Sequence, residues 1–73
     1  MKDNISEIFG KHLCSLRIEK GLTQKKVADI LQVSVSTYAN WEQGRREPDL
    51  AHLIRIANIL EVDMNTLFEL ETQ

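Results

Sequence analysis

Residues 23–44 read TQKKVADILQVSVSTYANWEQG, and this stretch predicts two short helices joined by a tight turn. Thr23 and Ser34 are typical N-cap residues, because their hydroxyl oxygens accept a free backbone N–H of a first helical turn. We therefore expect one helix over 24–31 and a second over 35–43. Two short helices this close together are typical of the helix-turn-helix unit, although ordinary small helical bundles contain such turns as well.

Helical periodicity continues on both sides of this stretch. Before it, apolar residues recur three to four positions apart, at Ile5, Ile8, Phe9, Leu13 and Leu16. After it, they recur at Leu50, Leu53, Ile56, Ala57 and Leu60, and again at Met64, Leu67, Phe68 and Leu70. Gly21 is expected to end the first helix, while Asp49 and Asp63 are expected to cap the last two. No segment alternates long enough to predict a strand, so the sequence predicts an all-α fold of five helices.

The chain of 73 residues has room for one small core, so we expect a single domain over 1–73. Its longest apolar stretch, Leu53 to Leu60, is interrupted by Arg55 and Asn58 and is too short to cross a membrane. The first residues carry no apolar leader segment, and one cysteine cannot form an internal disulfide. These features favour a cytoplasmic protein. A core this small leaves little space for a substrate cavity, which weighs against an enzyme.

The net charge of −2 and the pI of about 5.6 at first argue against a nucleic-acid partner. The charges are unevenly distributed, however: residues 1–22 sum to +1, residues 23–46 to +2 and residues 47–73 to −5. Because the local field decides what a surface binds, the basic middle of the chain is compatible with binding phosphate groups. The acidic C-terminal third is better suited to a position away from the phosphate groups.

The helix expected over 35–43 has two different sides when it is drawn as a helical wheel. The side expected to face inward holds Ser34, Tyr38, Trp41 and, at its edge, Glu42. The opposite side holds Ser36, Ala39, Asn40 and Gln43, with Val35 and Thr37 on the flanks. The two aromatic residues could stack on nucleobases, but their i, i+3 spacing on the inward side favours core packing. An outward side of short, polar side chains is what a helix needs to enter the DNA major groove.

Short motifs along the chain resemble those of one known family. In order, they are Gly21-Leu22-Thr23-Gln24, Val27-Ala28, Val33-Ser34, Ser36-Thr37-Tyr38, Glu42-Gln43-Gly44, Arg46-Glu47-Pro48, Leu53-Ile54, Ala57 and Leu67-Phe68. Together they resemble the lambda repressor/Cro, or XRE-type, helix-turn-helix family of prokaryotic and phage DNA-binding proteins. The resemblance covers about residues 9–68, with the helix-turn-helix unit at about 24–43, and implies a compact lambda-repressor-like fold. The family usually has glycine where this chain has Gln32, so we expect Gln32 to adopt a positive φ at a cost of about 1 kcal/mol.

The resemblance implies a role for each part of the predicted unit. Val35, Ser36 and Asn40 fall where the family reads bases, with Thr37 and Ala39 as neighbours that assist. The expected phosphate contacts are Gln24, Ser34, Gln43, Arg45 and Arg46. A helix N-terminus favours an anion, although an exposed polar residue, a plain N-cap and a solvated basic turn are the simpler alternatives for these positions. Arg17 and Glu42 occupy positions that the family often pairs as a partly buried salt bridge.

Family members read palindromic DNA as dimers, so the resemblance also implies a homodimer. One recognition helix contacts only a few base pairs, and a two-fold dimer places its two recognition helices about 34 Å apart. The acidic C-terminal third is the expected interface. By the family pattern Leu67 and Phe68 serve the core, which leaves Val62, Met64 and Leu70 as the expected dimer contacts.

Other chemistry finds little support in the sequence. His12 and Cys14 are two positions apart on a helix and point to different faces, and His52 has no Cys or His partner nearby. No metal site and no cofactor are therefore expected. There is no nucleophile elbow, phosphate loop or zinc-protease motif. Cys14 has no base beside it in the pattern, so we expect a partly buried structural thiol and no catalytic residue.

We therefore expect a sequence-specific, double-stranded DNA-binding transcriptional regulator and not an enzyme. The resemblance implies a repressor that binds a palindromic operator as a homodimer, with the helix 35–43 in the major groove. Such a protein is cytoplasmic and joins the nucleoid when it is bound to DNA. Two related functions fit the same residues: the antitoxin of a toxin–antitoxin pair, and the controller of a restriction–modification system. A protein partner, a toxin or an anti-repressor, therefore stays open, while no membrane partner is expected.

Overall fold

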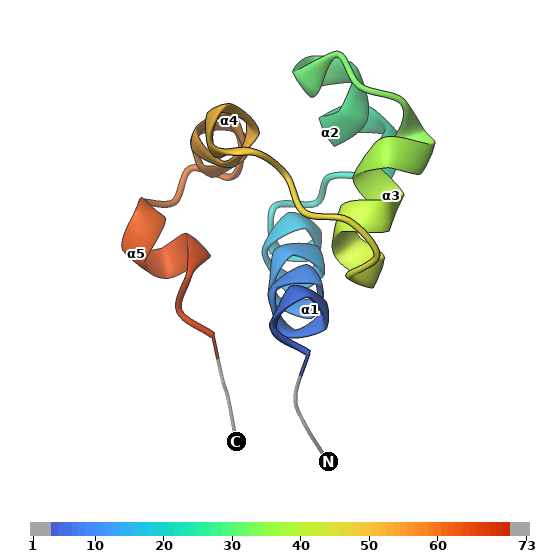
Figure 1. Cartoon of the computed structure of the whole chain (residues 1–73). Coiled ribbons are helices and arrows are strands. Elements are labelled where there is room, and N and C mark those ends of the chain that lie inside the picture. Colours follow the sequence, from blue (N-terminus) through green and yellow to red (C-terminus); the bar gives the residue numbers. More distant parts are fainter. Residues whose placement is uncertain (1–3, 71–73) are drawn as a thin grey trace.

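The computed structural model describes residues 4–70 of the chain. They form five helices: α1 (Ile5–Glu19), α2 (Gln24–Leu31), α3 (Val35–Gln43), α4 (Leu50–Leu60) and α5 (Met64–Leu67). No strand occurs among these residues, so the predicted all-α fold is confirmed. Helix α1 lies between the pair α2 and α3 on one side and the pair α4 and α5 on the other (Figure 1).

Each helix begins at a residue whose side-chain oxygen accepts a backbone N–H of the first turn. Thr23, Ser34, Asp49 and Asp63 do this for α2 to α5, as predicted. Asn4 does the same for α1, a cap that the apolar pattern alone did not reveal. A cap of this kind typically contributes about 1 kcal/mol. Since the cap and the N–H group that it bonds are only two or three positions apart, the start of each helix is encoded locally.

Two helices end at residues other than glycine that adopt a left-handed conformation. Gln32 after α2 has a φ of 62°, as predicted, and Glu61 after α4 has a φ of 60°, which was not predicted. In both places the following residue, Val33 or Val62, donates its backbone N–H at 3.0 Å to a carbonyl five positions back. These bonds satisfy helix carbonyls that otherwise lack a partner, which offsets the cost of the left-handed residue.

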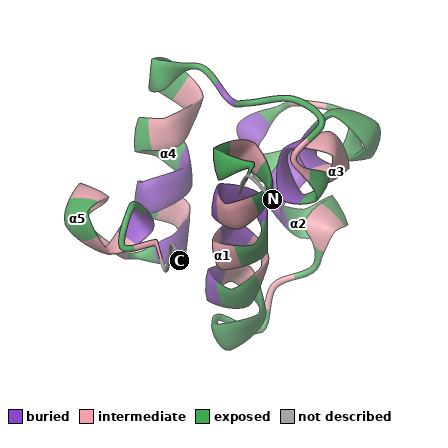
Figure 2. Cartoon of the chain, turned by 60° about the horizontal axis from the view of Figure 1, so that its bottom comes forward, coloured by how far each residue is buried: buried purple, intermediate pink, exposed green. Residues whose placement is uncertain are grey.

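The core draws on every helix and lies around α1. Its buried apolar residues are Phe9, Leu13 and Leu16 of α1, Val27, Ala28 and Leu31 of α2, Tyr38 and Trp41 of α3, Ile56, Ala57 and Leu60 of α4, and Leu67 of α5. The buried segments of α1, α3 and α4 are the purple parts of the ribbon in Figure 2. Burying these side chains against α1 fixes where α3 and α4 lie relative to each other.

Helices α1 and α3 approach each other so closely that two positions accept only glycine. A Cβ atom added to Gly10 would lie 2.3 Å from the backbone oxygen of Glu42. A Cβ atom added to Gly44 would lie 2.7 Å from the Cα of Glu7, and Gly44 also has a φ of 78°. The backbone of α3 therefore rests directly on α1, which leaves α3 little freedom to slide or tilt.

Three apolar positions of the helical pattern are exposed in the structure. Leu50 is 68% exposed and Ile5 is 57% exposed, because each is the first residue of its helix and lies beyond the neighbours that cover the next turn. The expectation that Phe68 belongs to the core was wrong. Helix α5 ends at Leu67, so Phe68 does not continue its inward side and is 46% exposed. Its ring still stacks on Phe9, with 5.6 Å between the ring centroids.

Candidate nucleic-acid interface

The turn between α2 and α3 is held by local hydrogen bonds. The Ser34 hydroxyl accepts the backbone N–H of Thr37 at 3.0 Å and donates to the Thr37 hydroxyl oxygen at 2.8 Å. Gln32 and Val33 donate backbone N–H groups to the last turn of α2. The start of α3 is therefore fixed to the end of α2 by bonds that span only a few residues.

Helix α3 has the two sides that the wheel predicted, except that Ser34, expected on the inward side, is exposed because it is the N-cap that precedes the helix. Tyr38 and Trp41 are buried and pack edge to face, with 5.9 Å between ring centroids, so their predicted role in the core is confirmed. Glu42 is buried beside them. On the other side, Ser36, Thr37 and Gln43 are exposed, Val35 is exposed at the helix start, and Ala39 and Asn40 are half-buried. One helix thus combines an immobilised side with an uncovered side of short, mostly polar groups.

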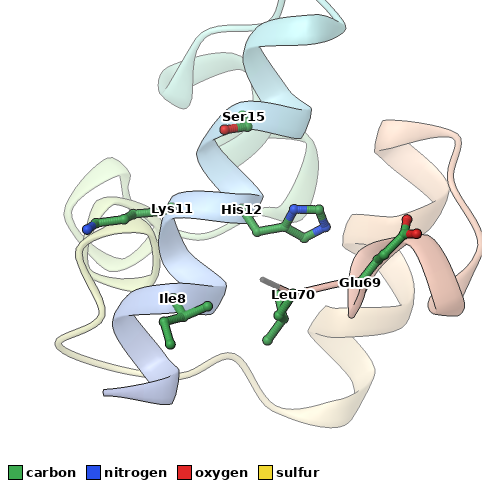
Figure 3. Close-up of a pocket in the computed structure, with 6 residues that line it drawn as sticks. All are labelled: Ile8, Lys11, His12, Ser15, Glu69 and Leu70. Carbon is green, nitrogen blue, oxygen red and sulfur yellow. The ribbon is translucent and has the colours of Figure 1, made fainter. Parts of the chain in front are cut away.

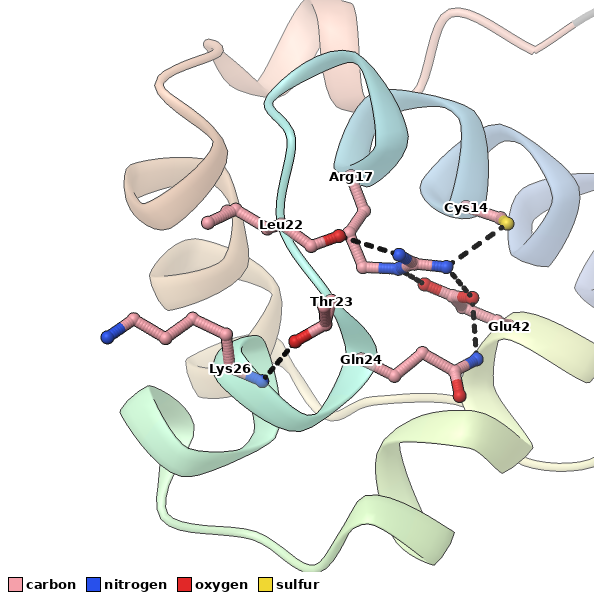
Figure 4. A network of polar contacts seen from close by, with 7 residues as sticks. All are labelled: Cys14, Arg17, Leu22, Thr23, Gln24, Lys26 and Glu42. Carbon is pink, nitrogen blue, oxygen red and sulfur yellow. Dashed lines mark hydrogen bonds and ion pairs between the residues drawn. The ribbon is translucent and has the colours of Figure 1, made fainter.

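The buried side of α3 is anchored by a network of charged hydrogen bonds (Figure 4). Arg17 of α1 donates to the Glu42 carboxylate through Nε at 2.6 Å and through Nη2 at 3.2 Å. Its Nη1 donates to the Leu22 carbonyl at 2.7 Å, and Nη2 also lies 3.5 Å from the Cys14 sulfur. Gln24, the first residue of α2, donates its amide to Glu42 Oε1 at 2.9 Å. The network therefore joins α1, α2 and α3 at one point.

Charge and burial act in opposite directions on this network. Burial raises the pKa of Glu42, but hydrogen bonds from Arg17 and Gln24 outweigh it, so the pKa lies below its ordinary value. The bond to Glu42 raises the pKa of Arg17 further above its already high value. Burial raises the pKa of Cys14, and the nearby Glu42 carboxylate adds to this effect. The pair is thus ionised at neutral pH, whereas Cys14 is a protonated thiol beside it.

The phosphate contacts expected from the sequence lie near both ends of α3. The amide of Gln24 is bonded to Glu42 in the last turn of α3 and has a second N–H that this bond does not use, whereas Ser34 caps the start of α3. At the other end, the Asn40 carbonyl accepts the backbone N–H groups of Arg45 and Arg46 at 3.0 and 3.4 Å. Both arginine side chains belong to exposed residues. The expected phosphate contacts therefore lie at the start of α3, with Ser34, and around its end, with Gln24, Arg45 and Arg46.

The predicted dimer contacts differ in their surroundings. Val62, Met64 and Leu70 are all half-buried and pack against the outside of the core. Leu70 lines a groove with Ile5 and Phe68, whereas Val62 and Met64 do not line it. The pattern missed this division because it gives the periodicity of a short helix and not the path of the chain after it.

Several contacts that position the site were not predicted. Arg55 of α4 donates to the Ile30 carbonyl at 3.1 Å and so closes the end of α2. Gly10 permits the close approach of α1 and α3, and an isolated glycine inside a helical pattern was the available signal for it. Gln24 was expected to contact a phosphate, and its hydrogen bond to Glu42 could not be predicted because the two residues are 18 positions apart.

The three side chains weighed for metal chemistry make ordinary protein contacts. His12 Nε2 lies 2.7 Å from the Thr66 carbonyl oxygen, and His52 Nδ1 lies 2.8 Å from the Asp49 carboxylate. Within residues 4–70, no cluster of three or more His, Cys, Asp or Glu residues could hold a metal ion. None of the helices formed by these residues is both long and apolar enough to span a membrane.

A short helix followed by a tight turn and a second helix with an uncovered polar side defines the helix-turn-helix class of DNA-binding proteins. The sequence model of the helix-turn-helix family matches residues 15–67. The chain belongs to the XRE-type helix-turn-helix family of DNA-binding transcriptional regulators. This confirms the resemblance inferred from the sequence motifs.

Two curated relatives come from Bacillus subtilis. The uncharacterized HTH-type transcriptional regulator YqaE is 40% identical over 65 residues, which are 89% of this chain and 56% of YqaE. The SPbeta prophage-derived uncharacterized HTH-type transcriptional regulator YonR is 37% identical over 62 residues, which are 85% of this chain and 57% of YonR. The chain thus spans a little over half the length of these relatives.

Solved structures of two regulators have the same arrangement of helices. The restriction-modification controller protein C.AhdI from Aeromonas hydrophila superposes with a TM-score of 0.82 at 30% identity, covering 88% of this chain and 97% of that one. The clp gene regulator ClgR from C. glutamicum superposes with a TM-score of 0.84 at 25% identity, covering 93% and 88%. The fold is therefore shared over nearly the whole described chain.

Proposed function

We propose that this protein is a sequence-specific regulator that binds double-stranded DNA with α3 in the major groove. The uncovered side of α3 carries the proposal. Its side chains are short and mostly polar, while the opposite side of the same helix is tied to α1 and α2 by buried hydrogen bonds. A helix that is held in place and presents short, polar side chains fits the width of the major groove. No catalytic step is part of this proposal.

The proposed base contacts centre on Asn40, with Val35, Ser36, Thr37 and Ala39 around it. An asparagine amide can bond N6 and N7 of adenine at the same time, and small apolar groups such as Val35 and Ala39 fit against a thymine methyl. The outer side of α3 carries no arginine or lysine for guanine. We therefore propose half-sites that are rich in A·T pairs at the positions α3 contacts.

The proposed phosphate contacts flank these base contacts. Gln24 and Ser34 lie at helix starts, where backbone N–H groups and the helix dipole favour an anion. Gln43, Arg45 and Arg46 lie at and after the end of α3. Phosphate contacts fix the orientation of a protein on the duplex without reading its sequence, so these residues set the register in which Asn40 meets the bases.

We further propose that the protein acts as a cytoplasmic homodimeric repressor on a palindromic operator. A single α3 reads too few base pairs for useful specificity in a genome, and a two-fold dimer doubles the number. Val62, Met64 and Leu70 are the proposed contacts between the two copies, because they are apolar, half-buried and far along the chain from the basic turn. A Leu70→Glu variant should then show a lower mass by light scattering than the parent protein on the same DNA.

A controller of a restriction–modification system is the second candidate function. The similarity to C.AhdI favours it, because this chain covers 97% of that small controller. The two candidates differ in their target and not in their chemistry. Selected binding sites that lie beside restriction and methyltransferase genes would favour the controller.

The proposal is tested by selecting bound fragments from a random pool of double-stranded DNA. The expected result is an inverted repeat whose half-sites are centred about 10 base pairs, or a multiple of this, apart. A pool that stays random after several rounds would contradict sequence-specific binding. Enrichment of one isolated, non-palindromic half-site by a monomer would contradict the homodimer and leave the role of α3 intact.

A further inference from the structure

A groove with a volume of about 250 Å³ lies where the two ends of the described chain come together. We call it the terminal groove, and it is lined by Ile5, Phe9, Pro48, Leu53, Phe68 and Leu70. Ile5 and Phe68 remain about half exposed there, although both are large and apolar. Apolar side chains gathered in one hollow mark an interaction site more often than apolar side chains that are scattered singly.

The terminal groove is poorly suited to a small molecule. Binding sites for small molecules typically enclose about 300–1,000 Å³ and contain polar groups that orient the ligand. The polar residues that line the groove are Ser6 and Glu47, and the Ser6 hydroxyl already donates to the Glu47 carboxylate. What remains is an open apolar surface that accepts one or two side chains of another protein.

The charges around the terminal groove are mainly acidic. Glu47 lines it, and no lysine or arginine does so. Asp49 is exposed and adjoins the lining residue Pro48 in the chain, whereas Arg46 is the basic residue that adjoins Glu47. The net field at the rim is therefore negative. A partner that complements it carries lysine or arginine beside its apolar residues.

A second hollow lies beyond Leu70, along the exposed side of α1 (Figure 3). It has a volume of about 600 Å³, and Lys11, His12, Ser15 and Glu69 line it together with Ile8 and Leu70. Its walls carry both a positive and a negative side chain, so it favours neither sign of charge. The terminal groove is the more selective of the two surfaces.

The terminal groove is separate from the proposed DNA contacts. None of its lining residues belongs to α3, to the start of α2 or to the Arg45–Arg46 turn. A protein bound there would leave the outer side of α3 uncovered. Occupancy of the groove and binding of DNA are therefore compatible.

We propose that the terminal groove is the docking site for a partner protein that presents a short amphipathic helix with apolar residues on one side and lysine or arginine beside them. A second copy of this chain is a poorer occupant, because it would bring Glu47 and Asp49 of two chains together. The proposal goes beyond the DNA-binding function and does not depend on it. Because Leu70 lines the groove, the partner would compete with the homodimer contact proposed for Leu70, and the light-scattering measurement below separates the two occupants.

The experiment titrates the isotopically labelled protein with a designed helical peptide and follows the backbone amide signals. The probe has leucine at helical i, i+3, i+4 and i+7 spacing and lysine elsewhere. One control peptide replaces lysine with glutamate, and another replaces leucine with alanine. The expected result is a set of shifts at Ile5, Phe9, Leu53 and Phe68, with binding about tenfold tighter than for either control.

Matched variants separate the groove from general attraction between opposite charges. Ile5 and Ile18 are both exposed isoleucines of α1, at 57% and 61%, but Ile18 does not line the groove. Ile5→Ser should weaken binding of the probe about tenfold, and Ile18→Ser should leave it unchanged. Phe68→Ser provides a second groove variant, and thermal melting verifies that each variant is folded.

Three results would overturn the proposal. The glutamate peptide could bind as tightly as the lysine peptide, or Ile18→Ser could weaken binding as much as Ile5→Ser. The third result is an Ile5→Ser variant that has a lower mass by light scattering but binds the peptide with unchanged affinity. This result would assign the groove to a second copy of the chain. None of these results bears on whether α3 binds DNA.

Discussion

The two sides of α1 are joined to their neighbours by different kinds of contact. Toward α2 and α3, Arg17 and Glu42 form an ion pair whose side chains are 12% and 4% exposed, and Gln24 completes it. Toward α4 and α5, the described contacts are mainly apolar, with one hydrogen bond from His12 and the exposed Lys20–Glu61 pair. Apolar packing tolerates small shifts, whereas charged hydrogen bonds depend on distance and angle. The orientation of α3 is therefore specified more strictly than that of α4.

This difference matches the roles proposed for the two sides. A helix that reads bases must hold its side chains in one register, and a buried network that spans three helices does this better than packing alone. The side of α4 and α5 instead keeps apolar and acidic groups at its surface. It is the part of the molecule where a protein partner can be accommodated.

Removing Glu42 should have the largest effect on stability. We expect Glu42→Ala to lower the free energy of unfolding by about 3–5 kcal/mol, because Arg17 then stays buried without a counter-charge. Urea unfolding measures this change. The matched variant Lys20→Ala breaks the exposed pair on the other side of α1 and should cost less than about 1 kcal/mol. Equal losses in the two variants would remove the contrast between the two sides.

Acid should weaken the α3 side through the same carboxylate. Because the pKa of Glu42 is lower in the folded protein than in the unfolded chain, its stabilisation is complete above the ordinary glutamate pKa. It is lost as the pH falls through the lower, folded-state pKa. Unfolding measured from neutral to acidic pH should therefore show a steep loss of stability that is shallower in Glu42→Gln.

The control for this measurement lies on the other side of α1. The bond from Lys20 lowers the pKa of the exposed Glu61, so this residue also contributes to the acid response. Glu61→Gln should nevertheless change the slope less than Glu42→Gln, because the Glu61 pair is exposed to solvent. A larger change for Glu61→Gln would show that surface pairs dominate the acid response.

Removing the Asn40 amide should affect DNA recognition and leave the fold intact. Asn40→Ala is expected to cost about 1–3 kcal/mol of binding free energy at one base position and to relax the preference there. Binding to all single-base variants of a selected operator measures this effect. Asn58, an exposed asparagine in α4, is the matched control, and Asn58→Ala should change nothing. An unchanged base preference in Asn40→Ala would refute the proposed contact.

The smallest expected effects come from the two left-handed residues, one on each side of α1. Gln32→Gly should raise the free energy of unfolding by about 0.5–1 kcal/mol, because glycine adopts a positive φ without strain. Glu61→Gly should give a smaller rise, because it also removes the bond to Lys20. Thermal melting detects both changes. A loss of stability in Gln32→Gly would mean that its side chain makes a stabilising contact.

Most of the fold could be predicted because its signals are local. The N-caps at Thr23, Ser34, Asp49 and Asp63 act over three residues, so the limits of α2 and α3 and the starts of α4 and α5 agree with the expectation. The two sides of α3 follow from its period of 3.6 residues in the same way. The burial of Phe68 was predicted wrongly, because a periodic pattern does not reveal where a helix as short as α5 ends.

The sequence by itself determined the helices, the turn at Gln32 and the residues that α3 presents to its surroundings. The physical reason is that caps, left-handed residues and helical periodicity involve groups at most a few positions apart. Only the tertiary structure decided that Gln24 donates to Glu42, that Gly10 receives the backbone of α3, and that Ile5 and Phe68 meet in one groove. These contacts join residues 18 to 63 positions apart, and burial at such distances depends on which surfaces the rest of the chain covers.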